Sequence, residues 1–141
     1  MDPQSRVRIL EEARSYVGTP YHHRGMVKGV GVDCGTLLYL VYGTQFSLRT
    51  YPKGYAVDWS LHRDEELYLD FIKQYLRETS TPEPADIVLF RIGRCYSHGT
   101  ILTERGSVIH AWGSRRDGRV MESSISFFRN RARKVFKVVK E

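Results

Sequence analysis

The sequence has little of what marks several broad classes of protein. It contains only two cysteines among 141 residues, too few for the disulfide framework of a small secreted domain. No apolar run approaches the roughly 20 residues of a membrane-spanning helix, and the N-terminal residues lack the apolar region of a signal peptide. We find no internal repeat and no nucleic-acid-binding motif. We therefore expect no membrane span, no nucleic-acid partner, and a chain that is cytoplasmic as synthesised.

What the chain does have is the composition of one globular domain. Its 141 residues are 41% hydrophobic and 27% charged, which is ordinary for a protein with a single core. The formal net charge of +6 favours an anionic partner such as a polymer, a nucleic acid or an acidic protein surface, although no motif supports the nucleic acid. No oligomerisation signal is present, so we expect a monomeric single domain over residues 1–141.

Helical signals occupy the first half of the chain. Asp2 and Pro3 form a typical N-cap and first-turn pair, and Gly18 is a typical helix end. Asp33 is a good N-cap for a second helix with an apolar face. We expect helices over about 2–18, 34–42 and 63–77, a glycine-rich loop at 22–32, and an insertion over about 46–80 that contains the third helix.

The pattern changes to β after Pro82 and Pro84. Runs of β-branched and aromatic residues predict strands at about 86–92, 98–103, 107–112, 119–122 and 135–139, with a turn or short helix at 125–128. Helices first and strands afterwards are typical of an α+β fold, not of an alternating α/β fold. We expect the N-terminal helices to pack on a C-terminal antiparallel β-sheet.

Cys34 is the side chain whose position most suggests chemistry. It follows Gly31-Val32-Asp33 and opens the second expected helix. The N-terminus of a helix stabilises negative charge, and the thiolate is the nucleophilic form of cysteine. The alternative is a cysteine buried only for packing, because free cysteine is among the most buried residue types. The residues around Cys34 leave both interpretations open.

Two histidines favour the catalytic interpretation. If residues 103–105 form a hairpin loop, His98 lies directly opposite His110 on one face of the sheet. His98 would then take the proton of Cys34, and His110 would orient His98 from its other nitrogen. The competing interpretation is a zinc site that adds Cys95 to these three residues. Zinc ligands normally come in two close-spaced pairs and only one such pair is present, so we expect no metal.

Four blocks of residues, in this order, resemble the NlpC-type cysteine peptidases. The blocks are Gly18-Thr19-Pro20-Tyr21, Gly31-Val32-Asp33-Cys34, Pro84-Ala85-Asp86 with the apolar residues 87–90, and Ser97-His98 followed by Val108-Ile109-His110-Ala111. Members of this family are papain-like enzymes that hydrolyse peptide bonds in bacterial cell-wall stem peptides. The resemblance implies a papain-like fold with Cys34 as the nucleophile, His98 as the general base and then acid, and His110 as the orienting third member.

The resemblance also implies that Tyr21 lies beside Cys34 and helps to form the oxyanion site. A tyrosine hydroxyl and a backbone N–H at a helix start are plausible oxyanion donors. The alternative for Tyr21 is to pack the first helix against the second. The family implies peptidoglycan stem peptides as the partner and needs no cofactor.

The sequence departs from the usual family pattern in several places. Gly35-Thr36 follow the cysteine where Ser-Gly is usual, and the segment from Gln45 to Arg77 is longer than usual. These features resemble members associated with phage tails and prophages, which implies tail proteins as partners and a tail-associated location from which the enzyme acts on the cell wall. Two alternatives stay open: a non-catalytic tail-assembly or interaction module, and a thiol amidase or transpeptidase with a non-wall γ-glutamyl or acyl substrate.

Overall fold

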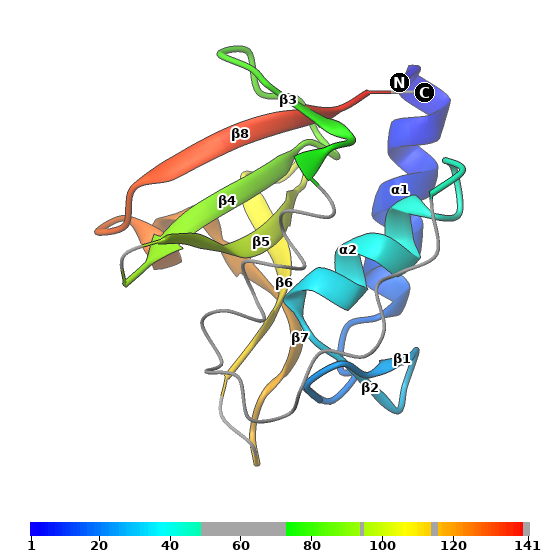
Figure 1. Cartoon of the computed structure of the whole chain (residues 1–141), viewed down its shortest axis with the longest axis vertical. Coiled ribbons are helices and arrows are strands. Elements are labelled where there is room, and N and C mark those ends of the chain that lie inside the picture. Colours follow the sequence, from blue (N-terminus) through cyan, green and yellow to red (C-terminus); the bar gives the residue numbers. More distant parts are fainter. Residues whose placement is uncertain (49–72, 94, 114–115, 140–141) are drawn as a thin grey trace.

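The computed structural model describes residues 1–48, 73–93, 95–113 and 116–139. Helices α1 (Pro3–Ser15) and α2 (Cys34–Tyr42) lie together on one side of the strands in Figure 1. The strands are β1 (Met26–Val27), β2 (Gly31–Val32), β3 (Leu76–Glu78), β4 (Ile87–Ile92), β5 (Cys95–Leu102), β6 (Ser107–Trp112), β7 (Arg119–Ser124) and β8 (Arg133–Val138), and a 3-10 helix, η1, covers Ile125–Phe128. Within the described residues, no helix is both long enough and apolar enough to span a membrane.

The main sheet has six strands in the order β3-β8-β4-β5-β6-β7, and every neighbouring pair is antiparallel. Strands β1 and β2 form a separate two-stranded hairpin before α2. The predicted α+β class, with N-terminal helices and a C-terminal antiparallel sheet, is confirmed.

The predicted helix over 63–77 is wrong at its end. Residues 63–72 lie outside the described residues, as does most of the proposed insertion over 46–80. Leu76 to Glu78 form strand β3, which pairs with β8 in the register Leu76↔Val138. Strand β3 is stabilised by a partner some sixty residues away and needs no periodic pattern of its own. The apolar spacing over 63–77 therefore favoured a helix. The loop predicted at 22–32 likewise contains the hairpin β1–β2.

Side-chain caps fix where the two helices begin. Asp2 accepts a hydrogen bond from the backbone N–H of Ser5 at 2.7 Å. Asp33 accepts one from the N–H of Thr36 at 2.9 Å, while the Thr36 hydroxyl accepts one from the N–H of Asp33 at 2.8 Å. This reciprocal capping box satisfies donors that the helix itself cannot, and a cap of this kind contributes about 1 kcal/mol. Cys34 is therefore held as the first residue of α2.

The core lies on both faces of the sheet. Along β4, Ile87 and Leu89 join a cluster with the helices, whereas Val88 and Phe90 join a second cluster with Phe128 of η1. Successive strand residues point to opposite faces, so burial on both faces gives the continuous apolar run of this strand. Both sides of the sheet are thus available to hold buried side chains in place.

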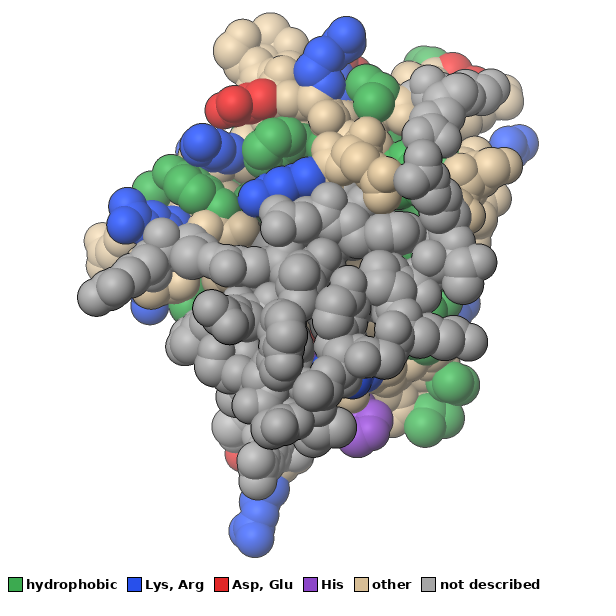
Figure 2. Space-filling model, viewed as in Figure 1, with side chains coloured by type: hydrophobic (Ala, Val, Ile, Leu, Met, Phe, Trp, Pro, Cys, Tyr) green, Lys and Arg blue, Asp and Glu red, His purple; other side chains and the backbone are tan. Residues whose placement is uncertain are grey.

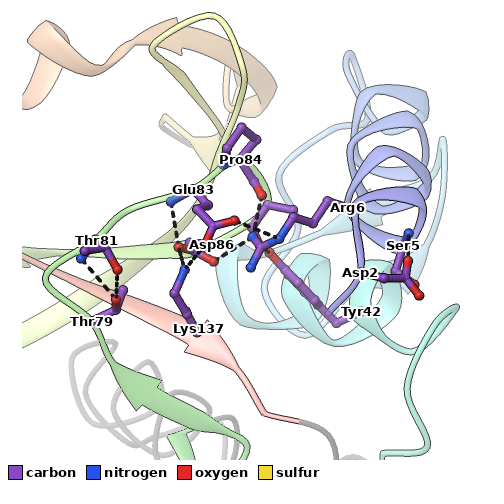
Figure 3. Close-up of polar contacts among 11 residues, drawn as sticks. Asp2, Ser5, Arg6, Tyr42, Thr79, Thr81, Glu83, Pro84, Asp86 and Lys137 are labelled. Carbon is purple, nitrogen blue, oxygen red and sulfur yellow. Dashed lines mark hydrogen bonds and ion pairs between the residues drawn. The ribbon is translucent and has the colours of Figure 1, made fainter.

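One group of charges, centred on the buried Asp86, ties α1 to the sheet. Asp86 is 0% exposed, and its carboxylate meets Arg6 Nη1 at 2.9 Å and Lys137 Nζ at 3.0 Å. It also accepts a hydrogen bond from the backbone N–H of Glu83 at 2.8 Å. Figure 3 shows Arg6 of α1 and Lys137 of β8 reaching Asp86 from two different directions. We refer to Arg6, Glu83, Asp86 and Lys137 as the Asp86 cluster.

Candidate active site

A cavity of about 230 Å³ opens where two neighbouring strands separate. Strands β5 and β6 pair only at Ile101↔Ile109 and Leu102↔Val108, so the first half of β5 and the end of β6 are not joined. The residues that line the cavity are Tyr21, Cys34, Ile92, His98, Ala111, Trp112 and Gly113. Three of the four residues predicted for the site therefore meet at one cavity, and His110 lies directly behind His98.

Cys34 contributes its sulfur from the first turn of α2. The residue is 3% exposed, and Sγ lies 3.8 Å from the carbonyl oxygen of Ser97 on β5. The first-turn N–H groups and the helix dipole favour a negative charge at this point. The position is therefore suited to a thiolate, as expected for a nucleophile.

The two histidine-bearing strands do not pair in the predicted register. The loop is Glu104-Arg105-Gly106 instead of residues 103–105, because Thr103 N–H bonds to the Ser107 carbonyl at 2.9 Å. Gly106 has φ +67°, the left-handed conformation that ends a three-residue hairpin loop. The predicted direct opposition of His98 and His110 is therefore wrong. The pairing differs by two positions, which keeps both side chains on one face as diagonal neighbours.

The two imidazole rings are directly hydrogen-bonded. His98 Nε2 lies 2.9 Å from His110 Nδ1, and His110 Nε2 lies 2.9 Å from Ser123 Oγ on β7. His98 is 5% exposed and His110 is fully buried. With Nε2 of His98 engaged by His110, Nδ1 is the nitrogen that remains for a proton of Cys34. The rings thus form a line of hydrogen bonds from the cavity to β7.

A β-bulge directs His98 toward the cavity. Phe90 pairs with His98 and Arg91 pairs with Tyr96, so Ser97 is an extra residue in β5. Bulges twist a strand and re-aim the neighbouring side chains, and they are common beside active sites. The same bulge turns the Ser97 carbonyl to the sulfur of Cys34. Nothing in the sequence indicated this irregularity.

Burial makes both histidines poor acceptors of a proton from solvent. It lowers the pKa of His98 well below its ordinary value, and the neighbouring His110 adds to the effect. Burial alone lowers the pKa of His110 to about 4. Among the described residues, no carboxylate forms an ion pair with either ring. Both imidazoles are therefore neutral near pH 7 unless a negative charge forms beside them.

Aromatic rings hold the histidines in place. Trp112 packs edge-on against His98 at a centroid distance of 4.8 Å, and Phe128 does the same to His110 at 5.2 Å. Sequence reasoning did not identify Trp112, although its position two residues after His110 on the same strand face was a usable signal. Ser123 was missed as well, since its place beside His110 depends on the β6–β7 register.

Tyr21 is fixed beside the cysteine by backbone contacts. Its N–H donates to the Gly118 carbonyl at 2.8 Å, and it forms an isolated bridge with Val32, two residues before Cys34. Gly31 allows this approach, because a Cβ there would lie 2.6 Å from the Cβ of His22. Tyr21 and Cys34 consequently share the cavity.

The described residues contain no group of three or more His, Cys, Asp or Glu side chains that could hold a metal ion. The side chain of Cys95, which the zinc interpretation required, lies outside the described residues. The site can hold a thiol, a base and an orienting imidazole next to one another in space, in that order.

Comparisons with known proteins agree with this geometry at the level of the fold. No family model matches the sequence, and no curated protein matches it. Among solved structures, the NlpC/p60 domain of the peptidoglycan hydrolase SagA superimposes with a TM-score of 0.61 at 22% identity, over 92% of this chain and 97% of that one. A lipoprotein-like protein of the NLP/P60 family from Staphylococcus aureus gives a TM-score of 0.65 at 19% identity.

A hypothetical invasion protein of Mycobacterium tuberculosis gives a TM-score of 0.56 at 19% identity. The match to the staphylococcal protein covers 100% of this chain and 43% of that protein. The match to the mycobacterial protein covers 98% of this chain and 64% of that protein. This chain therefore spans only part of the length of each of these two proteins. The chain has the α+β papain-like fold of the NlpC/p60 domains.

Proposed function

We propose that the protein is a cysteine peptidase that hydrolyses amide bonds in peptidoglycan stem peptides. The observation that carries the proposal is the 2.9 Å contact between His98 Nε2 and His110 Nδ1, beside a cavity that Cys34 also lines. This contact leaves Nδ1 of His98 for the thiol and provides the orienter of a catalytic triad. The solved domain of the peptidoglycan hydrolase SagA, which shares the fold, supports the choice of substrate.

The reaction begins with proton transfer from Cys34 Sγ to Nδ1 of His98. The thiolate attacks the carbonyl carbon of the scissile amide, and a C–S bond forms as the carbonyl π electrons move to oxygen. When the C–N bond breaks, the proton on His98 passes to the leaving amine. His98 then takes a proton from water, whose oxygen attacks the thioester. Collapse of that intermediate releases the acid and returns the proton to Cys34.

The oxyanion formed in both steps needs hydrogen-bond donors. The backbone N–H of Cys34, in the first turn of α2, and the hydroxyl of Tyr21 are our assignments for this role. Donors of this kind stabilise the transition state most when they are fixed before the reaction. The backbone contacts that hold Tyr21 against Gly118 and Val32 supply that rigidity.

The surface charge suits an anionic wall polymer. The chain carries 22 Lys and Arg residues against 16 Asp and Glu residues. In Figure 2, basic side chains gather on the part of this face where β8 and β4 run in Figure 1. Long-range attraction of this kind raises the local concentration of an acidic substrate and weakens as salt is added.

Delivery by a phage tail is part of the proposal. It rests on the Asp33-Cys34-Gly35 variant and the long segment between α2 and β3, which resemble tail-associated members of the family. Co-purification of the chain with tail particles would support this part. Its absence from such particles would remove the delivery route and leave the chemistry in place.

The proposal is tested by digesting purified peptidoglycan and small muropeptides and identifying the products by mass spectrometry. The native chain should produce new free stem-peptide ends, Cys34→Ala should produce none, and Cys95→Ala should act like the native chain. The fragment masses name the bond that is cut. Intact substrates after incubation with the native chain would favour a tail-assembly module, whereas hydrolysis of only non-wall γ-glutamyl compounds would favour the amidase alternative.

A further inference from the structure

The line of hydrogen bonds that begins at His98 does not end at the second histidine. His110 Nε2 lies 2.9 Å from Ser123 Oγ, and His110 Nδ1 lies 2.9 Å from His98 Nε2. The register Val108↔Ser123 places Ser123 diagonally across from His110 on β7. The hydroxyl is therefore held by the sheet itself, on the side of His110 remote from the cavity.

The direction of this line follows from the state in which Cys34 is a thiolate. His98 then carries a proton on both nitrogens, so its Nε2–H must donate to His110 Nδ1. His110 must therefore have its lone pair on Nδ1. A neutral imidazole carries its single proton on the other nitrogen, so His110 Nε2–H donates and Ser123 Oγ accepts.

We propose that Ser123 is a positioning residue that sets the tautomer of His110 and thereby stabilises the protonated form of His98. The inference rests on the proposed role of Cys34 as nucleophile. With an acceptor at Ser123, the proton of His110 is kept on Nε2. Without that acceptor, His110 can carry its proton on Nδ1 and donate to His98. The remaining proton of His98 would then lie on Nδ1, where it blocks proton transfer from the thiol.

The apolar environment of His110 makes its tautomer depend on the Ser123 hydroxyl. The ring is fully buried, with Trp112 and Phe128 packed nearby. Among the described residues, Ser123 is the polar side chain that contacts its Nε2. A buried N–H that loses its partner is costly, which makes the tautomer sensitive to this one hydroxyl.

The test uses the full chain in three variants: Ser123→Ala, Ser123→Thr, which keeps a hydroxyl, and Ser126→Ala as a matched control at an exposed position of η1. Imidazole ¹⁵N NMR shows which nitrogen of each ring carries the proton. Alkylation of Cys34 by iodoacetamide, followed across pH by peptide mass spectrometry, reports thiolate formation without any substrate.

In the native chain at pH 7 we expect His98 and His110 both to carry their proton on Nε2. Ser123→Ala should place a fraction of His110 protons on Nδ1, slow the alkylation of Cys34 at pH 7 about ten-fold and move its pH profile upward. Ser123→Thr and Ser126→Ala should match the native chain.

Two results would overturn the inference. One is a native His110 protonated on Nδ1, which needs no variant to be observed. The other is a Ser123→Ala chain whose NMR pattern and alkylation profile equal those of the native chain. Failure of the proposed function would give a different result. The wall peptides would then stay intact in the digestion, while the NMR and alkylation results would still be the expected ones.

Discussion

Two regions of this molecule bury ionisable side chains, and they do so in opposite ways. In the Asp86 cluster, the fully buried carboxylate meets cationic groups of Arg6 and Lys137 at 2.9 and 3.0 Å. At the candidate active site, His98 and His110 meet each other, Ser123 and aromatic rings. One region pairs opposite charges, and the other surrounds uncharged imidazoles with apolar groups.

The difference separates structural from chemical use of buried polar groups. A carboxylate fixed between the cationic groups of Arg6 and Lys137 joins α1 to β4 and β8. An imidazole in an apolar setting is costly to protonate from solvent, yet it can take a proton when a thiolate forms beside it. The Asp86 cluster therefore serves the fold, and the histidine pair is suited to the proton transfer that we propose.

The largest effect should come from removing the base. We expect His98→Ala to lower kcat/KM for muropeptide hydrolysis by about 10³- to 10⁴-fold, because His98 is the proposed acceptor of the proton of Cys34. Product formation measured by mass spectrometry gives the rate, and circular dichroism checks that the chain is folded. A variant that keeps more than about a tenth of the native activity would show that His98 is not the general base.

Breaking the Asp86 cluster should affect stability and leave the chemistry alone. Asp86→Asn leaves Arg6 and Lys137 without their shared carboxylate, and we expect the free energy of unfolding to fall by roughly 3 kcal/mol. Glu83→Gln is the matched control, because Glu83 lies in the same cluster with its side chain 54% exposed, and exposed ion pairs contribute little. Urea unfolding measures both changes.

The fraction of Asp86→Asn protein that remains folded should hydrolyse muropeptides at the native rate per active molecule. The number of active molecules is measured by alkylating Cys34 with iodoacetamide. A large loss of activity without a loss of stability would mean that the two regions are coupled, which would remove the contrast drawn between them.

The last prediction is a pH dependence of stability that comes from the histidine pair. The pKa of His110 is lowered in the folded chain from 6.5 to about 4. Between these values the unfolded chain binds the proton and the folded chain does not, so the free energy of unfolding falls as the pH falls from 6.5 toward 4. Over that window His110 alone accounts for up to about 3 kcal/mol, and His98 acts in the same direction.

Urea unfolding at several pH values between 7 and 5 measures this slope before most carboxylates titrate. His110→Asn should flatten it, because the variant removes one of the two buried imidazoles. An unchanged slope in that variant would show that the histidines are not kept neutral by burial.

Local signals in the sequence were sufficient for a large part of the fold. The N-cap signal of Asp33 predicted the start of α2 at Cys34, and the run of residues 107–112 predicted β6 with its observed bounds. The hairpin was predicted to place His98 and His110 on one face, which holds although the register was wrong. These features depend on residues that are close together in the chain.

Features that depend on distant residues were not predicted. Strand β3 exists through pairing with β8, and the bulge at Ser97 depends on how β5 fits β4. The contact between His110 and Ser123 depends on the β6–β7 register. Nothing in the local sequence encodes these pairings, so the environment of the histidines became visible only in the folded chain.

The most direct test of the central claim is whether Cys34 becomes covalently acylated during turnover. The protein is mixed with muropeptides, quenched with acid within the first turnovers and measured by intact and peptide mass spectrometry. We expect a thioester adduct on the peptide that contains Cys34, with the mass of the acyl half of the substrate, and no adduct in Cys34→Ala. Cleavage of the muropeptide by Cys34→Ala at the native rate, without any adduct, would contradict the account.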